Sequence, residues 1–141
     1  MSVKIRVLVV DDYEPWRRYV STALQTQPDL EIVAEAVDGL EALKDAEQLK
    51  PDLILLDIVL PELNGIEAAR RIRKLSDNSK ILFVSMGRNP EVVWGALGTG
   101  AHGYLVKSDA GSELFVAIRT VMGDKRFVSS SVDLAKSRLK L

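Results

Sequence analysis

Ile5-Arg6-Val7-Leu8-Val9-Val10-Asp11-Asp12 is the stretch of this sequence that decides the fold. Its apolar run is almost unbroken, which is typical of a strand buried on both faces of a parallel sheet. Four further short runs rich in apolar residues follow along the chain, at residues 31–34, 52–56, 80–84 and 103–106. We therefore predict five β-strands.

Between these runs the apolar residues recur at three- and four-residue steps, as on one face of an α-helix. Asp38 and Asn64 each precede a glycine at a predicted helix start, and Gly123 follows the last predicted helix. Five alternating strand–helix units predict an α/β fold with a doubly wound parallel sheet. We expect residues 1–128 to form one domain, and residues 129–141 to form a C-terminal tail or linker.

The composition excludes several classes of function. The chain has 141 residues, a net charge of −1, no cysteine and one histidine. The lack of cysteine excludes disulfides, thiolate catalysis and Cys-based metal sites. The near-neutral charge gives no overall attraction to nucleic acid or to anionic membranes. No apolar run approaches the roughly 18–20 residues of a membrane span. We expect a soluble cytoplasmic protein with no membrane partner.

Polar residues follow four of the five predicted strands directly. Asp11 and Asp12 follow the first strand, Asp57 the third, Ser85 the fourth and Lys107 the fifth. In an open parallel sheet these strand ends meet at one edge, where ligands bind. Crowded carboxylates repel one another unless a cation intervenes, and Mg²⁺ prefers such oxygen ligands. An aspartate beside Mg²⁺ and a lysine is arranged to accept a phosphoryl group.

In this order and spacing, the residues resemble the receiver domains of two-component response regulators, which have a flavodoxin-like fold with strand order 2-1-3-4-5. The resemblance rests on residues 7–12, 55–65 and 103–107 together with Ser85, and it covers residues 4 to about 128. Residues 100–118 further resemble the subfamily whose receivers precede a LuxR/NarL-type helix-turn-helix output domain. Ser108, where many receivers carry proline, agrees with that placement.

The resemblance implies a phosphoacceptor and a magnesium site. Asp57 would take the phosphoryl group from a sensor histidine kinase. Asp12, Asp57 and the backbone carbonyl of Val59 would bind Mg²⁺ directly, and Asp11 would bind it through water. The chain would then be a signalling domain and not an enzyme, beyond catalysing its own phosphorylation and dephosphorylation.

The resemblance also implies a conformational switch that controls an output, which we expect to be transcription, or a partner. Ser85 would hydrogen-bond the phosphoryl group, Lys107 would pair with it, and Tyr104 would turn inward when Ser85 moves. A homodimer on phosphorylation is compatible with this scheme. DNA would be reached only through an output domain, which this chain does not contain. The linker-like residues after Gly123 favour a longer natural protein over a lone receiver.

Two other functions stay open beside the leading one. A Mg²⁺-dependent phosphatase with an aspartyl nucleophile typically carries a second acid two residues later, where this chain has Val59 or Tyr13. A receiver-like module that only docks or dimerises, without phosphorylation, is the alternative reading of the same fold. Tyr104 can equally be a core residue, and Trp16 and Trp94 are interpreted as packing residues.

Overall fold

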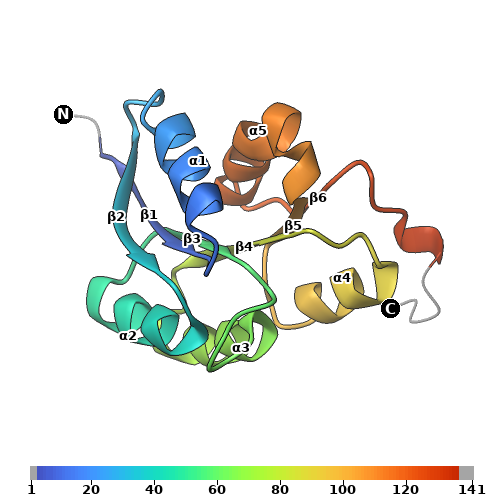
Figure 1. Cartoon of the computed structure of the whole chain (residues 1–141), viewed down its shortest axis with the longest axis horizontal. Helices are drawn as coiled ribbons and strands as arrows, with labels where there is room; N and C mark the ends of the chain where they lie inside the picture. The colour runs from blue at the N-terminus through green and yellow to red at the C-terminus, as the bar shows by residue number, and fades with distance from the viewer. Residues whose placement is uncertain (1–2, 137–141) are drawn as a thin grey trace.

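The computed structural model describes residues 3–136, which form a parallel six-stranded sheet with helices on both faces (Figure 1). The strands are β1 (Ile5–Val10), β2 (Leu30–Ala36), β3 (Leu53–Leu56), β4 (Lys80–Ser85), β5 (Gly103–Val106) and β6 (Phe127–Val128). Their spatial order is β2-β1-β3-β4-β5-β6. The predicted doubly wound sheet and its order 2-1-3-4-5 are therefore confirmed, and a short sixth strand is added beside β5.

Two helices cover one face of the sheet and three cover the other (Figure 1). On the first face lie α1 (Glu14–Leu24) and α5 (Ala110–Met122), and on the second lie α2 (Gly39–Leu49), α3 (Gly65–Leu75) and α4 (Pro90–Leu97). The predicted helix starts are confirmed, because the side chains of Asp38 and Asn64 accept the backbone N–H groups of Glu41 and Glu67. Two short 3₁₀ turns, η1 (Lys107–Asp109) and η2 (Leu134–Lys136), complete the elements.

The core is divided between the two faces by the alternation of side chains along the strands. In β1, Val7 and Val9 pack toward α1 and α5, while Leu8 and Val10 pack toward the other three helices. All four side chains are at most 1% exposed. Because the central strands are apolar on both faces, polar chemistry is confined to their ends.

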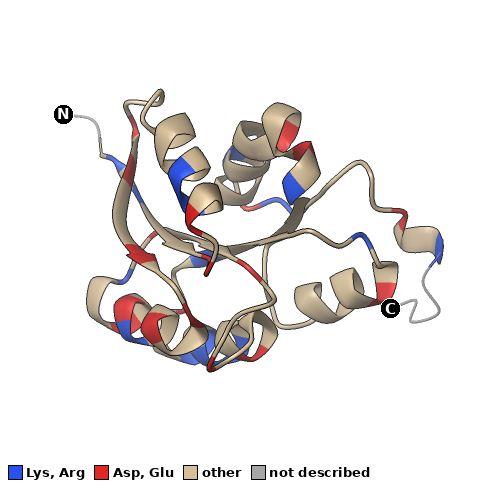
Figure 2. Cartoon of the chain, viewed as in Figure 1, with Lys and Arg blue, Asp and Glu red and all other residues tan. Residues whose placement is uncertain are grey.

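Charged side chains lie mainly on the outer surfaces of the helices, with acidic and basic residues close together on α2 and α3 (Figure 2). On α3, Glu67 pairs with Arg70 at 3.4 Å and with Arg71 at 3.2 Å. Exposed pairs of this kind contribute little to stability, on the order of 0.5 kcal/mol each. Across residues 3–136, no helix has both the length and the apolar character needed to cross a bilayer.

The chain does not leave the domain after α5. Residues 127–128 form β6, and η2 lies against α4 at the right of Figure 1. A two-residue strand is too short to produce a periodic pattern, so the sequence did not predict β6. The domain boundary at residue 128 stays a prediction, and residues 137–141 of the predicted tail lie outside the described residues.

Candidate functional site

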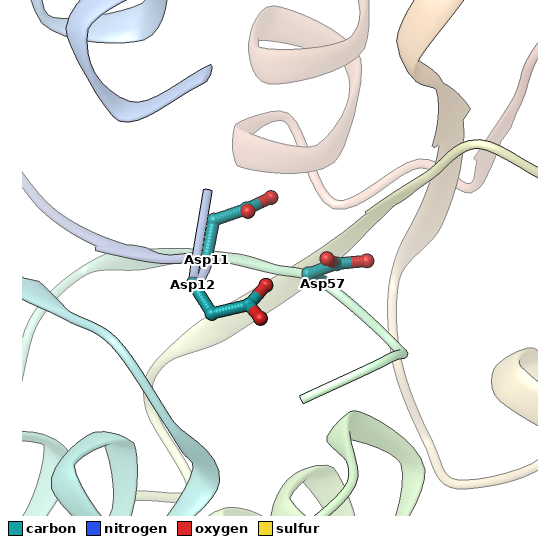
Figure 3. Close-up of side chains that lie close together, drawn as sticks. All are labelled: Asp11, Asp12 and Asp57. Carbon is teal, nitrogen blue, oxygen red and sulfur yellow. The ribbon is translucent and has the colours of Figure 1, made fainter. Parts of the chain in front are cut away.

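Three carboxylates from two neighbouring strands converge at the carboxyl edge of the sheet (Figure 3). Asp11 and Asp12 follow β1, and Asp57 follows β3, whose last residue Leu56 pairs with Val10 of β1. One oxygen from each of the three side chains lies within 4.8 Å of the others. Asp11 is 1% exposed and Asp57 7% exposed, whereas Asp12 is open to solvent. The sequence prediction that these three side chains meet is confirmed.

Lys107, the first residue of η1, brings a positive charge to the same place. Its Nζ lies 2.6 Å from Oδ2 of Asp11 and 3.6 Å from Oδ2 of Asp57. The contact with Asp11 is a close ion pair to a carboxylate that is almost fully buried. The other oxygen of Asp11 accepts the backbone N–H of Tyr13 at 2.8 Å. One lysine thus faces three carboxylates.

Burial and the surplus of negative charge both affect the pKa of Asp57. Burial, followed by the neighbouring Asp11 carboxylate, raises the pKa of Asp57 to about 6, although Lys107 acts in the opposite direction. The backbone N–H of Ile58 donates to Oδ1 of Asp57 at 2.7 Å and also favours the ionised form. At neutral pH this carboxylate is therefore largely ionised and nucleophilic, but it lies in an environment that disfavours its charge.

The donor set fits a hard divalent cation. Carboxylate oxygens are the ligands that Mg²⁺ prefers, and Mg²⁺ is usually held by one or two of them together with water. The buried Oδ2 of Asp11 has the Nζ of Lys107 at 2.6 Å, and this lysine faces three carboxylates, so the cluster keeps a surplus of negative charge that a cation would balance. Val59 lies on the loop after Asp57 and lines the same hollow, with its side chain 75% exposed. The role of its carbonyl as a ligand stays a prediction.

An open hollow of about 700 Å³ lies above the carboxylates, and sequence reasoning missed its apolar wall. Tyr13, Trp16, Tyr19 and Met86 line it. The rings of Trp16 and Tyr19 stack with centroids 5.2 Å apart, and Nζ of Lys107 lies 5.3 Å from the Trp16 ring centroid. Trp16 is therefore more than the packing residue predicted. The available signal was three aromatic residues within the eight that follow Asp11.

Ser85 and Tyr104 lie together on the other side of Asp57, where they line a second hollow. Ser85 ends β4 and is 7% exposed, and its Oγ accepts a long contact of 3.5 Å from the backbone N–H of Gly87. Tyr104 is fully buried, and its hydroxyl donates to the carbonyl of Gly87 at 2.8 Å. The ring thus already points inward in this structure, whereas its movement stays a prediction.

Comparison with known proteins agrees with this geometry. The family model described as the response regulator receiver domain matches residues 7–119. The response regulator protein VraR of Staphylococcus saprophyticus is 34% identical over 137 residues, which are 97% of this chain and 65% of that protein. VraR of Staphylococcus aureus is 35% identical over 96% of this chain and 66% of its own length. The chain thus spans just under two thirds of the length of these relatives.

Solved structures give the same picture. A two-component response regulator of the LuxR family from Aurantimonas sp. SI85-9A1 superimposes with a TM-score of 0.90 at 31% identity, over 97% of this chain and 99% of that one. The signal receiver domain of the putative response regulator NarL from Mycobacterium tuberculosis superimposes with a TM-score of 0.82 at 32% identity, over 87% and 99% of the two chains.

Proposed function

Because this chain belongs to the family of response regulator receiver domains of two-component systems, we propose that it is a Mg²⁺-dependent phosphoacceptor that takes a phosphoryl group from a sensor histidine kinase onto Asp57. The observation that carries the proposal is the position of Asp57, an ionisable nucleophile in a buried acidic cluster with Lys107 3.6 Å away. Neither an ordinary helix cap nor a structural ion pair requires three carboxylates at this spacing.

The chemistry is a transfer between two nucleophiles. A carboxylate oxygen of Asp57 attacks the phosphorus of a phosphohistidine, the new O–P bond forms as the P–N bond breaks, and the imidazole nitrogen keeps the electron pair. Lys107 remains beside Asp57 to balance the charge added at the acyl phosphate. Asp12, Asp57 and the Val59 carbonyl would hold Mg²⁺ directly and Asp11 would hold it through water, and the bound ion would supply charge neutralisation for the transferred phosphoryl oxygens.

The added charge then changes the surroundings of Asp57. The hydroxyl of Ser85 donates to a phosphoryl oxygen, and Lys107 pairs with another phosphoryl oxygen. The ring of Tyr104 then moves into the space that Ser85 leaves. We propose that this rearrangement in the cytoplasm controls transcription through a separate output domain, and that the chain has no enzymatic role beyond its own phosphorylation and dephosphorylation. The relatives are named as response regulators, which supports a role of this chain in controlling an output.

The test is the intact mass of the chain after incubation with Mg²⁺ and acetyl phosphate. We expect a mass increase of one phosphoryl group, which is lost in EDTA and in Asp57→Ala. Asp77→Ala is the matched control, because Asp77 is an exposed aspartate at the other end of the strands. This variant should be labelled as the unchanged chain is.

Labelling that persists in Asp57→Ala would contradict the assignment of the phosphoacceptor. If no phosphoryl group is added from acetyl phosphate or from a phosphorylated histidine kinase, and Mg²⁺ does not bind, the function is that of a docking or dimerisation module instead.

A further inference from the structure

Residues 129–136, which we call the strap, hydrogen-bond to the backbone of β5 at Tyr104 and at Val106. The buried Ser129 donates its N–H to the carbonyl of Tyr104 at 2.9 Å. Its Oγ accepts the N–H of Val106 at 2.7 Å, and Val106 directly precedes Lys107. The strap thus continues the pairing of β6 along β5 up to the lysine.

Arg88 joins the strap to both loops that carry the switch, and Ser131 of the strap also donates to the carboxylate of Asp109 in η1. Nε of Arg88 donates to Oγ of Ser131 at 3.0 Å, and Nη2 of Arg88 donates to Oγ of Ser108 at 2.5 Å. Arg88 follows Gly87, whose carbonyl accepts the Tyr104 hydroxyl. Ser108 follows Lys107. The guanidinium therefore spans the β4–α4 loop, η1 and the strap.

The rest of the strap lies on α4 (Figure 1). Val132 and Leu134 pack against the core cluster that includes Val93 and Leu97 of α4. The indole N–H of Trp94 reaches the carbonyl of Leu134 at 3.4 Å. The strap is therefore held by apolar packing as well as by hydrogen bonds, and it covers part of the apolar surface of α4.

We propose that the strap reports the state of Asp57, docked on α4 while Asp57 is unmodified and released when it is phosphorylated; this coupling rests on the proposed function. Movement of Ser85 toward the phosphoryl group shifts the residues that follow it, up to Arg88. Movement of Lys107 shifts Ser108 and the N–H of Val106. The bonds to the strap depend on the present spacing of both loops, so they cannot all survive. Release uncovers the surface around Trp94.

Hydrogen exchange on the full chain tests the coupling. Acetyl phosphate and Mg²⁺ are added, intact mass confirms one phosphoryl group, and amide exchange is compared with that of the unlabelled chain. We expect the amides of residues 129–136, together with the N–H of Val106, to exchange about tenfold faster after labelling. Amides in the middle of β1 and β3 should not change, because β4 and β5 lie between those strands and β6 in the sheet.

Coupling is reciprocal, so loosening the strap must favour phosphorylation. Arg88→Ala removes the exposed guanidinium without touching the acidic cluster, and we expect faster exchange of residues 129–136 together with an about fivefold larger ratio of phosphorylated to unphosphorylated chain at equilibrium with acetyl phosphate. Trp94→Phe, which keeps the ring packing and removes the indole donor, should act in the same direction more weakly. Arg70→Ala on α3 is the control and should change neither measurement.

The outcomes separate this inference from the proposed function. A labelled chain whose strap exchanges at the same rate overturns the coupling and leaves the proposed function standing. An Arg88→Ala chain with a loosened strap and unchanged labelling at equilibrium also overturns it. A chain that takes no phosphoryl group overturns the proposed function and the coupling with it.

Discussion

At the amino ends of the strands, Asp52 and Ser79 are tied to hydrogen-bond partners in the protein, whereas at the carboxyl ends three carboxylates share one lysine. Oδ2 of Asp52 accepts the N–H of Arg6 at 2.8 Å, and the hydroxyl of Ser79 donates to the carbonyl of Pro51. At the carboxyl end, the lysine that pairs with Oδ2 of Asp11 must also balance Asp57, and the contact from the N–H of Gly87 to Oγ of Ser85 is long, at 3.5 Å.

The difference shows at which end of the strands the polar groups stabilise the fold, and at which end their charge is incompletely balanced. Satisfied buried polar groups contribute to stability, while unsatisfied ones cost free energy unless a ligand completes them. The amino end therefore stabilises the fold, and the carboxyl end would be completed by the proposed cation and phosphoryl group. Substitutions of the same kind at the two ends should consequently have different and sometimes opposite effects.

The largest contrast concerns Mg²⁺ binding. Asp12→Ala should weaken Mg²⁺ binding by about 100-fold, because even outer-shell changes typically cost about 10–100-fold in metal affinity. Asp77→Ala, at the opposite end, should leave the affinity unchanged. Isothermal titration calorimetry with MgCl₂ measures both. Equal affinities for the two variants would show that the acidic cluster is not the metal site.

The second contrast is in the sign of the change in unfolding free energy that a substitution causes. In EDTA at neutral pH, Asp57→Asn should raise the free energy of unfolding by about 1–2 kcal/mol, because it removes a carboxylate whose pKa of about 6 marks a disfavoured charge. Asp52→Ala should lower it by about 1 kcal/mol, because the N–H of Arg6 loses its partner. Urea unfolding measures both values, and a shared sign would refute the comparison of the two ends.

The third contrast uses two buried serines. Ser79→Ala should cost about 1–2 kcal/mol of unfolding free energy, because its hydroxyl also contacts Oγ of Ser76 at 2.6 Å. Ser85→Ala should cost less than about 0.5 kcal/mol, because its hydroxyl has no strong partner to lose. Comparable losses in urea unfolding would mean that Ser85 is a structural residue.

The smallest contrast is in pH dependence without metal. The folded state raises the pKa of Asp57 from 3.8 to about 6, so the folded chain binds this proton more tightly and Asp57 makes stability fall as pH rises through that window. Asp57→Asn should remove this component, as measured by urea unfolding in EDTA between about pH 4 and 7.

At the amino ends of the strands, the expected slope of stability against pH has the opposite sign. Nδ1 of His102 accepts the N–H of Ile81 at 3.1 Å, and burial, followed by Lys80 and Arg73, lowers the pKa of this imidazole below 6.5. Its contribution is present above 6.5 and is lost as the pH falls through the lowered pKa. His102→Gln should remove it. A slope that is the same in His102→Gln and the unchanged chain would contradict this.

Much of the fold could be predicted because local patterns agree with the final structure. The alternation of apolar runs and helical periods gives the sheet, and Asp38 and Asn64 cap the helices that they precede. The position of the site could be predicted from one geometric rule, since residues that follow parallel strands meet at one edge of the sheet. Asp11 and Asp57 could thus be placed together although 46 positions separate them.

The parts that could not be predicted depend on tertiary placement. The contact of Trp16 with Lys107 requires the angle at which α1 crosses the sheet, which no periodicity encodes. The bonds of Arg88 join residues 20 and 43 positions away, at Ser108 and Ser131. A two-residue strand such as β6 exists only because β5 offers free backbone groups to pair with.

That last feature bears on edge-to-edge pairing of the sheet with another chain. The outer edge of β5 would present unpaired N–H and C=O groups, and such edges template pairing with another chain. Phe127 and Val128 occupy the first half of this edge, and the side chain of Ser129 covers the N–H of Val106 at its far end. These three residues therefore block the pairing of another chain with this edge of β5. A chain trimmed before Phe127 should aggregate more readily than the full chain.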